Sequence, residues 1–414
     1  MQVKSFAGVQ GEDFQKSPLP AGGKIIKRVE AVDLFKFFVL FFMIQGHLFR
    51  AYLTESLLQG KWYTIHEILH GIVGPAFLFS AGFAAFLSYC NKKEQYIRPG
   101  RPFLMRLRRI LFVIWCGYWM HMPFFSLRKS MTTISQGLAP EFLKADILQC
   151  IGVSLLLFIL IALLFKNEKT IVMVSVLFSL LFFLLPPLVN GVHVWHIIDP
   201  YFDYNVSPFP LFPWAGFLFF GVISAYFYRW MNKGRGAATL YAEALLQYAP
   251  TICSHSKNEN PYAFKLMLII GIVIFPWYFF YTSVGYHRSE LTLLGNLTKI
   301  GGIFLLLWFS NWLAVKFRGR WIKWLKKAGK EPLFVYVLHL FIIFGSAFNP
   351  GLQGTFKNSL NMTEALSLFF VILLVVFSLA LFYNYLKEKH HVLWRFCFYV
   401  FWVVFFAFFI LRRY

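Results

Sequence analysis

Charged side chains are scarce in this chain. Only 14% of its 414 residues are Asp, Glu, Lys or Arg, whereas 58% are hydrophobic and 21% are aromatic. A soluble domain carries about 25% charged residues, so a soluble globule of this composition would expose apolar surface that it could not cover. The composition therefore predicts a chain dissolved in a lipid bilayer. It excludes disordered, collagen-like, coiled-coil and disulfide-scaffold proteins.

Acidic residues and paired cysteines are scarcer still. The chain has 18 Asp and Glu against 40 Lys and Arg, a net charge of +22. Its five cysteines are scattered and form no CxxC pair, which predicts neither a disulfide framework nor a thiolate metal site. On a soluble protein the positive charge would suggest nucleic acid. In a chain this apolar it indicates basic loops on the cytoplasmic side of a membrane, so no nucleic-acid partner is expected.

Long apolar segments dominate what is present. A helix that crosses a bilayer needs about 20 mainly apolar residues, and no segment shows the alternation of a membrane barrel. We predict an all-α fold, a polytopic membrane helix bundle with ten or eleven transmembrane helices, because the last segment could lie at the interface instead. The predicted spans are 31–53, 66–90, 108–126, 142–165, 169–187, 209–230, 263–283, 291–315, 331–349, 363–386 and 392–411.

The loops predict an orientation. Residues 91–109 hold seven cations against one acid, and residues 316–330 hold seven cations and no acid. With eleven spans both loops lie on the side of the N-terminus, and the loop at 188–208, which has no Lys or Arg, lies opposite. Because cytoplasmic loops are the basic ones, we expect a cytoplasmic N-terminus in a multi-pass protein of the plasma or inner membrane.

The sequence predicts one transmembrane domain that follows a polar N-terminal tail. Residues 1–27 are polar and are predicted to form a flexible cytoplasmic tail, and residues 28–411 a single transmembrane domain. Residues 231–262 form the longest cytoplasmic loop of that domain.

The first span carries ionisable residues, which are costly in lipid and therefore suspected of function. Eleven residues separate Lys36 from His47, about three helical turns plus 20°, so both lie on one face with a rise of about 16 Å between them. Asp33 lies on the same stripe. One helix face thus presents a charge near one membrane surface and an imidazole toward the other. A snorkelling lysine and a hydrogen-bonded histidine are the purely structural interpretation.

Other spans carry further polar residues. His66-Glu67-Ile68-Leu69-His70 has the form of the zinc-protease motif H-E-x-x-H. A protease also needs a third ligand and an open coordination position, and no second acidic motif stands out, so we favour polar groups that line an outer cavity and expect no metal. Asp146 and Gln149 lie three residues apart at the start of the fourth span, and His339 lies near mid-depth in the ninth, where a buried core histidine is the alternative.

Several of these segments together match a family pattern. Residues 28–36 followed by Gly46-His47-Leu48-Phe49-Arg50 resemble the first span of the heparan-alpha-glucosaminide N-acetyltransferase-like proteins. The Lys36-x10-His47 spacing is similar to the Arg/Lys-x10-His signature of the related acyltransferase-3 proteins. The chain departs from the pattern at Lys36, where Arg is commoner, and at Gln45-Gly46. Later blocks that resemble the family are 70–82, 146–152, 212–216 and 332–339.

The resemblance implies a transmembrane acyltransferase. Its co-substrate would be acyl-CoA, typically acetyl-CoA, supplied from the cytoplasm, and its acceptor an amine or hydroxyl of a sugar on the far side; an oligomer is possible. The candidate catalytic residues are His47, His70 and Asp146, of which His70 or Asp146 would orient His47. The candidate cofactor-binding residues are Lys36, Asp33, Arg50 and His339. A transporter or flippase of a polar small molecule or glycolipid also fits ionisable groups inside spans, and an intramembrane zinc protease is the other enzyme alternative.

Overall fold

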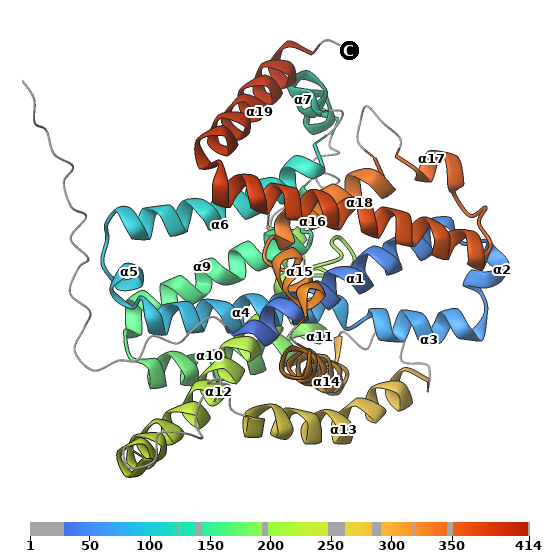
Figure 1. The fold of residues 1–414 in the computed structure, drawn as a ribbon. Helices are drawn as coiled ribbons and strands as arrows, with labels where there is room; N and C mark the ends of the chain where they lie inside the picture. Colours follow the sequence, from blue (N-terminus) through green and yellow to red (C-terminus); the bar gives the residue numbers. More distant parts are fainter. Residues whose placement is uncertain are drawn as a thin grey trace, which may run out of the picture.

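The chain folds into helices (Figure 1). The structure is a computed structural model, and it describes residues 29–122, 125–136, 143–192, 198–246, 261–283, 291–317, 319–345 and 351–412. The predicted tail at 1–27 and part of the predicted loop at 231–262 lie outside these residues. Within them the only strand-like pairing is an isolated bridge between Leu53 and Leu360. The all-α prediction is therefore confirmed for the part of the chain that is described.

The helices begin and end as follows. In chain order they are α1 (Glu30–Tyr52), α2 (Glu55–Leu58), α3 (Lys61–His70), α4 (Val73–Asn91), α5 (Glu94–Ile97), α6 (Arg101–Met120), α7 (Leu127–Ser135), α9 (Ile147–Phe165), α10 (Glu168–Leu184), α11 (Pro186–Val189), the 3-10 turn η2 (Asp199–Tyr201), α12 (Leu211–Leu246), α13 (Pro261–Ser283), α14 (Leu293–Lys316), α15 (Arg320–Ala328), α16 (Pro332–Ile343), α17 (Gln353–Phe356), α18 (Met362–Lys389) and α19 (His391–Leu411).

Among the described residues, eight helical segments are long and apolar enough to cross a membrane. They are α1, the α3–α4 segment (Lys61–Asn91), α9, the first part of α12 (Leu211–Asn232), α13, α14, α18 and α19. The chain is thus an integral, multi-pass membrane protein. The predicted count of ten or eleven is not confirmed, because α10 has only 17 residues, α16 only 12, and α6 begins with a cluster of arginines.

Helix α1 is the central element of the bundle. It packs against α3, α4, α14, α15, α16, α17 and α18, and most of its residues are buried. We call its two ends the Glu30 end and the Tyr52 end. Helix α19 differs: it has no buried residue, and in Figure 1 it projects away from the bundle next to α7.

Two glycines allow α4 and α12 to pack with their backbones in contact. A Cβ atom at Gly82 of α4 would lie 1.9 Å from the Leu218 carbonyl oxygen of α12. A Cβ atom at Gly221 of α12 would lie 2.1 Å from the Phe79 carbonyl oxygen of α4. Helices in lipid associate through such close contacts of small residues. Lipid tails are as apolar as the side chains, so the hydrophobic effect does not drive the helices together and close packing must do so.

Gly82→Val tests this packing. The added side chain must push α12 away from α4, so we expect the free energy of unfolding to fall by at least about 1–3 kcal/mol. The effect is measured as a lower midpoint of thermal unfolding of the purified protein in detergent. Gly100→Val is the control, because the nearest atom to a Cβ there is 3.8 Å away and the backbone is extended. An equal loss in both variants would contradict the interpretation.

Candidate functional site

Three histidines from three helices meet at the side of α1. The ring centre of His47 in α1 lies 6.1 Å from that of His70 in α3 and 5.4 Å from that of His339 in α16. We call these residues the histidine cluster. Gly46 makes the approach possible: a Cβ atom there would lie 2.0 Å from Nε2 of His70. The sequence predicted all three as site residues, and the structure brings them together.

The two outer histidines of the cluster each hold a nitrogen that is open to a further bond. Nδ1 of His339 lies 2.9 Å from the Val335 carbonyl oxygen. Because a carbonyl only accepts hydrogen bonds, this geometry assigns the hydrogen to Nδ1 and a lone pair to Nε2. Nε2 of His339 and Nε2 of His70 are both buried and have no hydrogen-bond partner among the described residues. His47 and His70 are partly buried, whereas His339 is buried, and imidazole nitrogens are suited to proton transfer.

Asp146 supports the cluster through α16. Its Oδ1 accepts a hydrogen bond from the Ile147 backbone at 2.7 Å, and it forms a capping box with Gln149 at the start of α9. Its Oδ2 accepts a hydrogen bond from the Tyr336 hydroxyl at 2.8 Å. Tyr336 lies one turn before His339, and the two rings are 5.7 Å apart. The structure therefore brings Asp146 to the helix that carries His339, whereas His70 is the residue that lies against His47.

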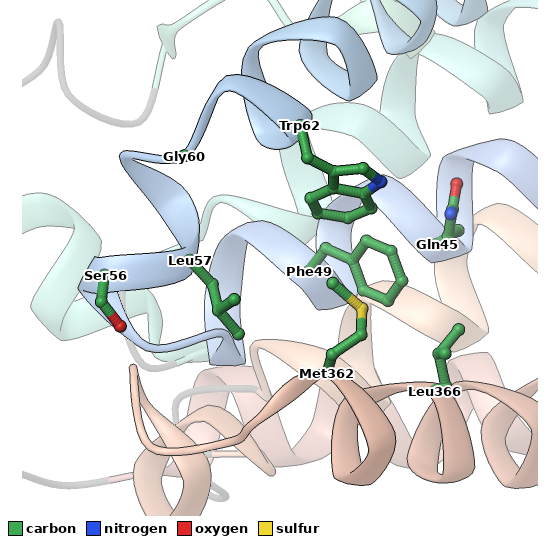
Figure 2. A pocket seen from close by; sticks show the side chains of 8 residues that line it. All are labelled: Gln45, Phe49, Ser56, Leu57, Gly60, Trp62, Met362 and Leu366. Carbon is green, nitrogen blue, oxygen red and sulfur yellow. The ribbon is translucent and has the colours of Figure 1, made fainter.

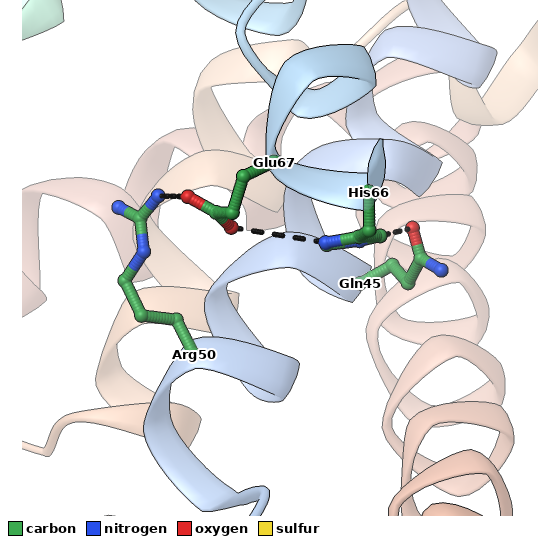
Figure 3. Close-up of polar contacts among 4 residues, drawn as sticks. All are labelled: Gln45, Arg50, His66 and Glu67. Atoms are coloured by element: carbon green, nitrogen blue, oxygen red, sulfur yellow. Dashed lines mark hydrogen bonds and ion pairs between the residues drawn. The ribbon is translucent and has the colours of Figure 1, made fainter. Parts of the chain in front are cut away.

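His66 and Glu67 of the H-E-x-x-H motif form a second polar group toward the Tyr52 end (Figure 3). We call the four residues Gln45, Arg50, His66 and Glu67 the polar row. Nε2 of His66 lies 3.3 Å from Oε1 of Gln45, and Nδ1 of His66 lies 3.7 Å from Oε1 of Glu67. Glu67 also forms an ion pair with Arg50, whose guanidinium is exposed. Arg50, a predicted cofactor-binding residue, is thus placed beside Glu67. Across the described ranges, no three His, Cys, Asp or Glu side chains are grouped as a metal site.

Asp33 and Lys36 lie toward the opposite, Glu30 end of α1. Helix α15 covers this part of α1: Lys326 forms an ion pair with Glu30, and a Cβ atom at Gly329 would lie 2.1 Å from the Asp33 carbonyl oxygen. The helical rise keeps Lys36 about 16 Å from His47. These two predicted residues are therefore not part of the histidine cluster.

A buried lysine was missed by the sequence analysis. Lys299 of α14 is 0% exposed, and its Nζ lies 5.6 Å from the ring centre of Trp214 and 5.9 Å from that of Tyr278. Cation–π contacts of this kind stabilise a charge in an apolar site. Tyr278 also reaches the region of the cluster, because its hydroxyl would lie 2.5 Å from a Cβ atom at Gly71, next to His70. The sequence could have indicated Lys299 as a candidate, because a lysine inside an apolar span is rare and costly.

Comparison with known proteins supports the resemblance. A family model described as heparan-alpha-glucosaminide N-acetyltransferase, catalytic, matches residues 28–257, more than half of the chain. The matched part includes His47, His70 and Asp146 and ends before α16, which carries His339. No curated protein and no solved structure matches the chain.

Tyr336→Phe tests the link between α9 and α16. It removes the hydroxyl that donates to the partly buried Asp146, so we expect the free energy of unfolding to fall by about 1–3 kcal/mol. Tyr385→Phe on α18 is the control: its hydroxyl is exposed and lies 3.5 Å from His390 Nε2, so its loss should cost less than about 0.5 kcal/mol. Thermal unfolding in detergent measures both. Equal midpoints for the two variants would show that the Asp146 bond does not hold α16.

Proposed function

The chain belongs to the heparan-alpha-glucosaminide N-acetyltransferase catalytic family, and we propose that it moves an acetyl group from cytoplasmic acetyl-CoA to a sugar on the far side of the membrane. The acceptor group is an amine or a hydroxyl. The observation that carries this proposal is the histidine cluster, which brings the partly buried imidazoles of His47 and His70 and the buried imidazole of His339 together inside a multi-pass bundle.

His47 is the proposed catalytic residue. It takes the proton as the N–H or O–H bond of the acceptor breaks, and the acceptor nitrogen or oxygen bonds to the thioester carbonyl carbon. The carbon–sulfur bond then breaks, and the thiolate of CoA takes up a proton. A histidine suits this role because a neutral imidazole has a lone pair that can take up a proton. A variant of the same route passes the acetyl group through His47 itself before the acceptor receives it. His70 and His339 act as positioning residues.

The donor is proposed to approach from the Glu30 end. The phosphates of CoA need cations, and exposed basic residues occur on α15, which packs on this end of α1. Lys36 lies between that end and His47 on the same helix, where it can meet the extended part of the cofactor. The cations of α15 are Arg320, Lys323, Lys326 and Lys327.

Two alternatives receive less support. A transporter or flippase would not need a transferase catalytic domain, and the family match covers the spans that carry His47 and His70. For a zinc protease, the motif residues would have to be free to hold a metal and a water molecule, whereas Glu67 pairs with Arg50 and His66 faces Gln45.

His47→Ala tests the assignment. General-base catalysis contributes about 10²–10⁴-fold to a rate, so we expect acetyl transfer to fall by at least about 100-fold. The measurement uses the full chain in sealed vesicles, radiolabelled acetyl-CoA on one side, and a methyl α-glucosaminide acceptor on the other. Wild-type protein that acetylates neither an amine nor a hydroxyl of any sugar would overturn the proposed function.

A matched control separates loss of His47 from loss of any membrane histidine. His121 is also partly buried, and its Nδ1 contacts the carbonyl oxygen of Gly117 at 2.9 Å, the local arrangement of His339. His121→Ala should retain wild-type transfer. If His47→Ala keeps its transfer rate as well, His47 is not the catalytic residue.

A further inference from the structure

A pocket at the Tyr52 end of α1 lies outside the histidine cluster and shares Gln45 with the polar row (Figure 2). Its volume is about 560 Å³, within the range of about 300–1,000 Å³ found for small-molecule sites. It is bounded by the last turns of α1, by the connection from α2 to α3, and by the first turns of α18. The lining residues are Gln45, Phe49, Ser56, Leu57, Gly60, Trp62, Met362 and Leu366.

The wall of this pocket is suited to a hydrocarbon. Figure 2 shows Phe49, Trp62, Met362 and Leu366 directed toward one another across the space. The polar side chains are those of Gln45 and Ser56, and the Gln45 amide already faces His66. A free sugar would lose its bonds to water here without replacing them, whereas an apolar chain gains by leaving water and packs well against a flexible methionine.

The pocket also lies where a lipid chain can enter. Met362 is the first residue of α18, the most apolar of the candidate spans, and most of that helix faces away from the bundle. Trp62 follows the polar turn at Gly60 and is partly exposed. Tryptophan is typical of the boundary between lipid and water, so the pocket lies at the depth where a headgroup ends and a chain begins.

The opposite wall of the pocket leads to the histidine cluster. Trp62 stacks on His66 with ring centres 5.6 Å apart, and Phe49 lies 5.3 Å from the same ring. The ring of His66 lies 6.1 Å from that of His70, which in turn lies 6.1 Å from His47. A chain that fills the pocket therefore lies against Trp62 and Phe49, the first rings of a row that continues through His66 and His70 to His47.

We propose that the pocket binds the hydrocarbon chain of a membrane-anchored amino sugar, and that this lipid-linked sugar is the acceptor. The chain supplies the binding energy through Phe49, Trp62 and Leu366, and the sugar is held beside the exposed Arg50–Glu67 pair and the histidines. This inference rests on the proposed acetyl transfer, because it specifies the acceptor of that reaction. The lipid-linked acceptor adds no chemical step to the acetyl transfer.

Photolabelling tests the pocket without requiring turnover. The probe is glucosamine linked to a hexadecyl chain that carries a diazirine, added to the full chain in phosphatidylcholine vesicles. We expect labelling of peptides that contain residues 56–62 and 362–366, and displacement by unlabelled hexadecyl glucosaminide. Leu366→Trp fills the pocket and should lower labelling about tenfold, the effect of losing about two buried methylenes. Met362→Trp serves in its place if that variant does not fold.

The control lies on the same helix. Leu374 of α18 is 71% exposed and does not line the pocket, so Leu374→Trp should leave labelling unchanged. Equal labelling of both tryptophan variants would overturn the proposal. Equally strong labelling of the same peptides by a diazirine phosphatidylcholine would also overturn it, because ordinary bilayer lipid would then occupy the pocket.

Acetyl transfer to two acceptors distinguishes this inference from the function on which it rests. We expect wild-type protein to acetylate hexadecyl glucosaminide in preference to methyl glucosaminide, and Leu366→Trp to reduce that preference about tenfold while transfer to the methyl compound persists. Transfer to the methyl compound without a preference would overturn the lipid-linked acceptor alone. Transfer to neither compound would overturn the proposed function, and photolabelling would still decide whether the pocket holds the chain.

Discussion

The His70 ring packs directly on the backbone of α1 at Gly46. This contact sets the distance between α1 and α3, and so the positions of the site residues on both helices. A side chain at position 46 would occupy the space of the imidazole. With glycine there, α3 lies close enough to α1 for His70 to reach His47 and for His66 to reach Gln45. The cluster and the polar row are thus two consequences of a single close approach between helices.

Polar groups in a bundle surrounded by lipid need partners within the protein, and the site residues meet this need in pairs from different helices. Asp146 of α9 accepts a bond from Tyr336 of α16, Glu67 of α3 pairs with Arg50 of α1, and Lys299 of α14 lies against Trp214 of α12. Each pair fixes one helix against another. Nε2 of His70 and Nε2 of His339 are among the buried polar atoms of the described residues that have no hydrogen-bond partner.

For the proposed acetyl transfer, the donor side, the histidines and the acceptor side are arranged along α1. Basic residues of α15 lie at the Glu30 end, His47 lies in the second half of the helix with His70 and His339 beside it, and the apolar pocket lies at the Tyr52 end. A water-soluble donor and a lipid-linked acceptor would then approach His47 from opposite directions. Under this proposal neither would need to cross the whole membrane, because the donor would be extended and the acceptor chain would already lie in the bilayer.

Composition, hydropathy and helical periodicity were enough to predict a multi-pass helical membrane protein and most of its spans. They also selected His47, His70 and His339 as candidates, because ionisable groups are costly in lipid and are easily seen in an apolar segment. The same rule would have selected Lys299 as a candidate residue, because it lies in an apolar span. The predicted number of spans is not confirmed, since α10 and α16 are shorter than the apolar segments that contain them. Only the tertiary structure decided that His339 lies against His47, that Asp146 meets Tyr336, and that α2, α3 and α18 enclose a pocket beside α1. Periodicity gives the face of each helix, but which faces meet depends on how side chains from distant parts of the chain fill the space between helices.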